Sequence, residues 1–166
     1  MPEKRTMERA RKDRREGKSG STQAGEFVRE EMHHVREGKH GAASTKQAIA
    51  IGLSKARRAG VKLPPPKKGT ASEKTRKSAK RAVAAGARGP KPASPRRSRA
   101  IRAALKREGH TAASKSALAR QAKSAAHKRT AGQRSAAARK AAKTKGSSVR
   151  TAAGRKGART RARSTG

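Results

Sequence analysis

The sequence predicts a mostly disordered chain with short α-helices, one small helical hairpin at residues 24–60 and no β-sheet. Two observations carry this prediction. The 166 residues include 47 Lys and Arg against 10 Asp and Glu, a formal net charge of +37. There is one Phe and no Trp or Tyr, so alanine supplies most of the hydrophobic content. Such a chain is expected to bury too little apolar area to offset the entropy lost on ordering.

The first 21 residues are expected to form a mobile charged arm. Eight of the ten acidic residues lie in residues 1–37, so this end differs in charge from the rest. Residues 1–20 mix both signs of charge without an apolar stripe, and the run from Gly17 to Gly20 interrupts any helix. Chain ends of this kind are commonly mobile.

Residues 22–63 form the most protein-like segment, and we expect a helical hairpin there. Val28, Met32 and Val35 recur at positions i, i+4 and i+7, the spacing of one helix face. Gly38 follows and is expected to end the helix.

The second helix of the hairpin is predicted from Ser44 onwards. Ser44 stands where an N-cap is expected, and Ile49, Leu53 and Ala56 repeat the same apolar spacing. Gly60 occupies the position of a left-handed C-terminal cap.

Residues 64–109 are expected to be a basic linker with weak helices. Three consecutive prolines at its start end the hairpin and stiffen the chain. The pattern predicts one helix at 72–85. Ser94 followed by Pro95 is a favourable N-cap and first turn for a second helix that ends before Gly109.

Residues 110–166 are expected to be a basic, Ala-rich disordered tail with one weak helix at 114–129. An internal similarity relates residues 36–56 to residues 107–125, since each segment has an Arg-Glu-Gly start, an Ala-Ala-Ser run and a basic helix. A duplicated hairpin and chance similarity between Ala-rich basic segments both explain it.

The second helix of the hairpin resembles the core of a bacterial family of small basic proteins known mainly as a domain of unknown function. The resemblance rests on the run Lys46-Gln47-Ala48-Ile49-Ala50-Ile51-Gly52-Leu53. It implies no reaction and no ligand. Residues 67–166 resemble, in composition alone, the Lys/Ala/Pro-rich tails of linker histones and their bacterial counterparts.

The charge indicates a nucleic-acid partner, because a polyanion can compensate so many cations. We expect non-sequence-specific binding and compaction of DNA, in a histone-like, nucleoid-associated role, through neutralisation of phosphates. The candidate nucleic-acid contacts are Lys46, Lys55, Arg57, Arg58, Arg96, Arg97, Arg99, Arg102, Lys106, Arg107, Lys115, Arg120, Lys123, Lys128, Arg129, Arg139 and Lys140.

Several alternatives remain open at this point. Charge alone does not separate DNA from RNA, so an RNA-binding or ribosome-associated protein is the second interpretation. A stress-related protein that binds acidic partners is the third. Self-association through the hairpin at 24–60 is compatible with each. The run Ser94-Pro95-Arg96-Arg97 fits either a turn in an A·T-rich minor groove or a simple helix start, and Gln47 is the only base-reading candidate in the hairpin.

Other functional classes find little support in the sequence. No nucleophile-base pair or phosphate loop is recognisable, so we expect no enzyme and no cofactor. His33, His34 and His40 lie near acidic residues, but the spacing fixes no third ligand, and no metal site is predicted. No apolar run indicates a signal peptide or a membrane segment, so a cytoplasmic location at the nucleoid is expected.

Overall fold

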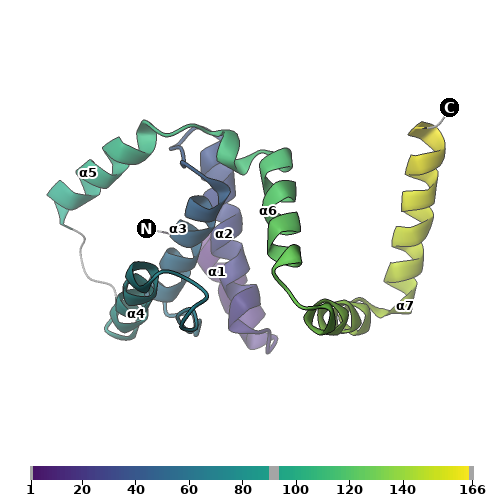
Figure 1. Cartoon of the computed structure of the whole chain (residues 1–166). Helices are drawn as coiled ribbons and strands as arrows, with labels where there is room; N and C mark the ends of the chain where they lie inside the picture. Colours follow the sequence, from purple (N-terminus) through teal and green to yellow (C-terminus); the bar gives the residue numbers. More distant parts are fainter. Residues whose placement is uncertain (1, 90–93, 165–166) are drawn as a thin grey trace. The chain divides into compact units, whose positions relative to one another are not determined.

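A computed structural model describes residues 2–89 and 94–164, without the side chains at 144, 145, 147, 150, 163 and 164 (Figure 1). Every regular element in these residues is a helix. They are α1 (Lys4–Arg15), α2 (Gly20–Arg36), α3 (Thr45–Arg58), α4 (Glu73–Ala87), α5 (Pro95–Lys106), the short 3₁₀ helix η1 (Thr111–Ala113), α6 (Lys115–His127) and α7 (Ala131–Ser164). Residues 1–121 and 122–166 form two separate compact units.

The prediction of a mostly disordered chain is wrong, because helices account for 75% of the described residues. The segment expected to be a mobile arm forms α1, which packs against α2. The segment expected to be a disordered tail, residues 110–166, contains η1, α6 and α7 up to Ser164, and residues 165 and 166 lie outside the described residues. Composition misled the prediction for a physical reason: alanine is the strongest helix former and Lys and Arg follow closely, so the same residues that cannot build a large core favour helices.

The expected helical hairpin is present and consists of α2 and α3. Ser19 and Ser44 cap the two helices, each accepting a hydrogen bond from the backbone N–H three residues later. Gly38 and Gly60 follow the helix ends with φ angles of +71° and +84°, in the left-handed region that glycine adopts most readily. Both helices of the hairpin therefore end just before the glycines that the sequence predicted as helix ends.

Two small clusters of buried residues hold the first unit together. One contains Met32, Val35, Ala42, Ala48, Ala112 and Ala113. The other contains Ala10, Ala24, Phe27 and Ala56, with Leu63 and other partly buried side chains packed around it. Most members are alanines, so the helix backbones lie close together and a few larger side chains fill the remaining space.

Residues 105–113, which we call the strap, return to the hairpin from far along the chain. The amides of Gly41 and Ala42 donate hydrogen bonds to Leu105 O and Gly109 O. Thr45 Oγ1 donates to Ala112 O at 2.6 Å, and the Arg36 guanidinium donates to Ala113 O at 2.8 Å. The two segments related by internal similarity are thus packed against each other.

The remaining helices carry fewer buried residues. α4 packs against α3 and buries Ala79 and Ala82. α5 begins at Ser94-Pro95 as a helix start and buries none of its residues. In the second unit, α7 is interrupted at Gly146, where φ is 70° and ψ is 170°.

Candidate functional site

Two buried carboxylates, Glu30 and Glu31, lie next to each other on α2 and face Lys55 of α3. Lys55 Nζ is 2.6 Å from Glu31 Oε2 and 3.6 Å from Glu30 Oε1. The Glu31 side chain is 0% exposed and that of Glu30 is 2% exposed. Two buried negative charges with one cation between them are costly without further positive partners. This region therefore holds excess negative charge inside a strongly basic protein.

Two histidines approach the same carboxylates. His40, in the connection after α2, places Nε2 3.1 Å from Glu31 Oε1 and Nδ1 3.0 Å from Gly41 O. The His34 ring lies edge-on to the His40 ring, with centroids 6.0 Å apart. Glu31, His34 and His40 each offer one donor atom, and these three atoms lie within 4.8 Å of one another. We call these three residues the Glu/His cluster.

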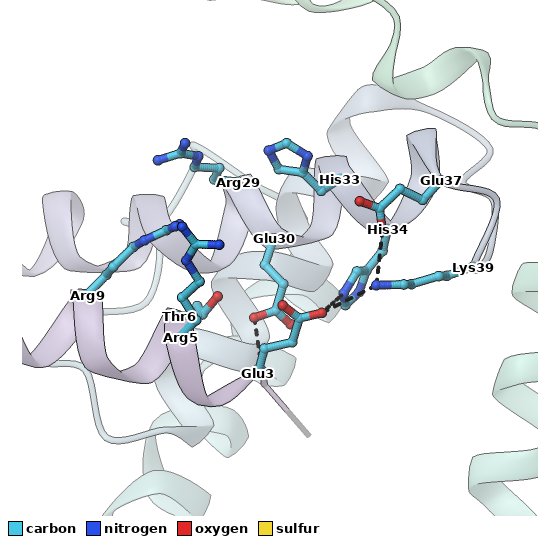
Figure 2. Close-up of a pocket in the computed structure, with 10 residues that line it drawn as sticks. All are labelled: Glu3, Arg5, Thr6, Arg9, Arg29, Glu30, His33, His34, Glu37 and Lys39. Carbon is cyan, nitrogen blue, oxygen red and sulfur yellow. Dashed lines mark hydrogen bonds and ion pairs between the residues drawn. The ribbon is translucent and has the colours of Figure 1, made fainter.

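A second layer of charges extends from the cluster to the surface (Figure 2). Glu3 Oε1 lies 2.8 Å from His34 Nε2 and 3.4 Å from Lys39 Nζ. The hydrogen bond from His34, and then that from Lys39, lowers the pKa of the Glu3 carboxyl. Lys39 also contacts Glu37 at 3.0 Å, and this hydrogen bond is the main reason why the pKa of Lys39 is raised.

An open cleft of about 330 Å³ lies beside this layer, between α1 and the second half of α2 (Figure 2). Glu3, Glu30 and His34 line it together with three arginines, Arg5, Arg9 and Arg29. The cleft thus places the buried Glu30 carboxylate beside the cationic groups of these arginines.

The predicted contacts on the hairpin divide into two kinds. Lys46 and Arg58 are exposed. Lys55 is instead paired with the buried carboxylates, and Arg57 is buried, donating hydrogen bonds to Leu63 O and Pro64 O. Desolvation lowers the pKa of Arg57. The structure thus gives Lys55 and Arg57 internal partners.

The predicted contacts beyond the hairpin are all exposed. α5 and its C-cap carry six of them, α6 carries three, two follow α6 and two lie on α7: Arg96, Arg97, Arg99, Arg102, Lys106 and Arg107, then Lys115, Arg120 and Lys123, then Lys128 and Arg129, and finally Arg139 and Lys140. Within the two units taken separately, these side chains are presented to solvent.

In the structure, Gln47 and the Ser94-Pro95 pair have local roles at helix starts. Gln47 Oε1 accepts a hydrogen bond from the Ala43 amide at 2.8 Å, so the side chain belongs to the cap of α3. Ser94 and Pro95 are the N-cap and first residue of α5, as the helix-start interpretation expected, and the minor-groove interpretation stays a prediction.

The sequence places His33, His34 and His40 near acidic residues but does not indicate the Glu/His cluster. Helical spacing alone would favour Glu30 as the partner of His34, because the two are four residues apart on one helix face. The cluster instead uses Glu31, which is fully buried, and His40, which lies in a connection whose path has no periodicity. A tight Gly38 turn and the nearby Gly41 are the only local signals that the chain returns there.

Residues 4–68 match the model of a family of unknown function (DUF6496). This segment is a DUF6496 domain. It extends beyond the module expected at 22–63, because α1 belongs to it, and it contains the whole Glu/His cluster. The expected resemblance is confirmed as a domain of unknown function, while the histone-like character of the tail stays a prediction. Neither the curated proteins nor the solved structures give a significant match.

In the described parts of the chain, no helix combines the length and the apolar character needed to cross a membrane.

Proposed function

We propose that this chain is a non-enzymatic, histone-like protein that binds the phosphates of DNA without reading its sequence, and that compacts DNA in the nucleoid. One observation supports this most: beyond residue 37 the chain holds 37 of its 47 basic residues but only two acids, Glu73 and Glu108. The predicted contacts beyond the DUF6496 domain are all exposed. Phosphate binding requires such a density of cations and no fixed geometry, since counterion release drives it.

The cations of helix α5 are exposed and take no part in a core. None of its residues is buried, and even Ile101 is 53% exposed. Its four arginines, at 96, 97, 99 and 102, therefore have no role in packing a core. A helix with this pattern needs another reason for its charges, and phosphate contacts supply one.

The DUF6496 domain has a different role in this proposal. Its Lys55 and Arg57 have internal partners, and most of the chain's acids lie within it. The domain anchors and orients the basic helices, or pairs copies of the chain, and contributes fewer phosphate contacts.

The test is the salt dependence of binding to several DNA duplexes of unrelated sequence, measured by fluorescence anisotropy. Log K should fall with log salt at a slope of about −0.9 per phosphate engaged, equally for every sequence. If about ten phosphates are engaged, affinity falls by roughly 10⁵ between about 50 and 200 mM salt. A shallow slope, or affinity confined to one duplex, contradicts the proposal.

Charge removal on α5 locates the contacts. Changing Arg96, Arg97, Arg99 and Arg102 to Gln should flatten the slope. The matched control removes four exposed cations from α1 instead, by changing Lys4, Arg11, Arg14 and Arg15 to Gln. Because acids surround α1, the control should change the slope less. An equal effect would mean that total charge, and not the basic helices, determines binding.

Competition separates the partners. RNA, or an acidic polypeptide, is added to the DNA complex at physiological salt. Retention on DNA supports the proposal. Displacement by an equal phosphate concentration of RNA favours the ribosome-associated interpretation, and displacement by the acidic polypeptide favours the stress-related one.

A further inference from the structure

We propose that Glu31, His34 and His40 form a binding site for a divalent transition-metal ion, with Zn²⁺ the best fit. The site lies wholly within the DUF6496 domain, and the inference is independent of nucleic-acid binding. Two imidazole nitrogens and one carboxylate oxygen are a donor set that Zn²⁺ commonly takes. Their donor atoms already converge to within 4.8 Å.

The first observation is the pair of contacts made by the two ring nitrogens of His40. Its Nδ1 is 3.0 Å from the carbonyl oxygen of Gly41, which can only accept, so Nδ1 carries the proton. In the neutral ring Nε2 then carries a lone pair and can only accept. It lies 3.1 Å from Glu31 Oε1, which is also an acceptor. Two acceptors facing each other at this distance require a cation between them, either a proton or a metal ion. A backbone carbonyl on the other nitrogen is the usual support of a metal-binding histidine.

The second observation is that the buried Glu31 carboxylate is only partly compensated. Both of its carboxylate oxygens are buried, and neither makes a hydrogen bond of good geometry. Lys55 contacts Oε2 and leaves Oε1 directed at His40. Lys55 is also the only ion-pair partner within the described residues for the adjacent Glu30. A divalent cation at Oε1 would balance the negative charge that Lys55 leaves uncompensated.

The surroundings complete the site. Glu3 is hydrogen-bonded to His34 and is the carboxylate that orients this ring. The side chains of His34 and His40 are 13% and 16% exposed, so the site is shielded but reachable from the surface. Three protein ligands leave a fourth position for water, and a bound ion would tie α2 to the connection that leads into α3.

The experiment uses the full chain, freed of nucleic acid. Zn²⁺ binding is measured by calorimetry, and Co²⁺ is used as a spectroscopic substitute. We expect one ion per chain and visible absorption typical of four-coordinate Co²⁺. His34→Gln and His40→Gln should each weaken binding at least tenfold. His33→Gln is the matched control, because His33 is the adjacent histidine of α2 and is exposed; binding should be unchanged. Equal losses in all three variants, or no binding by the natural chain, overturn the proposal.

A second measurement needs no variant and stays decisive if a substitution unfolds the domain. The ring resonances of the five histidines are followed by NMR during addition of Zn²⁺. Those of His34 and His40 should shift together at one equivalent, while those of His33, His110 and His127 stay in place. Shifts confined to the other histidines would show surface binding only, and the buried cluster would then be a proton-bridged ion network.

Discussion

Gly52 of α3 lies directly against the backbone of Val28 in α2, with no space for a side chain between the helices. A Cβ at this position would lie 2.7 Å from Val28 Cα and 2.9 Å from Val28 N. Backbone atoms cannot move aside without separating the helices. Gly52→Ala should therefore lower the free energy of unfolding by about 1–2 kcal/mol, after a gain of about 1 kcal/mol in helix propensity is set against overpacking. Urea denaturation measures the change.

Gly25 provides the matched control for Gly52. It lies inside α2, and a Cβ there would meet no atom within 4 Å. Gly25→Ala should raise the free energy of unfolding by about 1 kcal/mol, because only the propensity gain remains. If both substitutions stabilise the domain, the close approach of α2 and α3 is wrong.

Phe27 tests whether the domain has a cooperative core. Its side chain is 0% exposed and is the largest in the second buried cluster. Phe27→Ala should cost about 3–5 kcal/mol, a large part of the stability of a small domain, and should strongly lower the thermal midpoint followed by circular dichroism. Ile101→Ala, at a position 53% exposed, should change stability by less than about 0.5 kcal/mol. A natural chain that melts without a cooperative transition would contradict the packed fold.

The strap is tested at Thr45, whose hydroxyl donates to Ala112 O inside the structure. Thr45→Val keeps the shape but leaves that buried carbonyl without its partner, at a cost of about 1–3 kcal/mol. Hydrogen exchange at the amides of Gly41 and Ala42, which bond to the strap, should become faster. Thr160→Val is the control, since its hydroxyl bonds an exposed carbonyl on α7. Unchanged exchange in Thr45→Val would show that the strap does not depend on this bond.

Lys18 should make stability depend on pH at both ends of the scale. Its Nζ lies 2.8 Å from Asp13 and 2.7 Å from Glu16. The hydrogen bond to Asp13, and then that to Glu16, raises the pKa of Lys18, so its contribution is full below the ordinary value of 10.5 and is lost as pH rises through the raised value. The hydrogen bond between Lys18 and Glu16 also lowers the pKa of the Glu16 carboxyl. The contribution of Glu16 to stability is therefore present above pH 4.5 and is lost as pH falls through the lowered pKa.

The corresponding measurement compares Lys18→Gln with the natural chain. The difference in thermal midpoint should be largest between pH 4.5 and 10.5 and should shrink beyond each limit. Added salt should reduce it, because these groups are exposed. Lys12→Gln is the control, since Lys12 is 70% exposed and 3.9 Å from Glu16. A difference that stays the same well below pH 4.5 and well above pH 10.5 would mean that the ion pairs do not act.

The hairpin could be predicted because its signals are local. Ser44, Gly38 and Gly60 mark helix ends through their own backbone preferences, and the stripe of Ile49, Leu53 and Ala56 lies on one face of α3. The helices expected at 72–85 and 114–129 also have counterparts, α4 and α6. Their boundaries shift by one or two residues, as helix ends commonly do.

The ordered, packed state of the chain and the candidate metal centre could not be predicted from the sequence, because both depend on contacts between distant residues. Alanine was counted as too small to build a core, yet Ala24, Ala48 and Ala56 are fully buried where helices touch. The strap joins residues more than sixty positions apart. Likewise, His40 faces Glu31 only after the connection has folded back, so no spacing in the sequence indicates it.

The strap lies outside the segment that matches the family, and this separates two meanings of a domain boundary. Residues 4–68 form the unit that is shared with relatives, but Met32, Val35 and Ala48 share a cluster with Ala112 and Ala113 of the strap. A polypeptide cut at residue 68 would expose that apolar face to water. A polypeptide that keeps this cluster covered therefore has to extend at least to α6, where Leu118 also packs on the cluster.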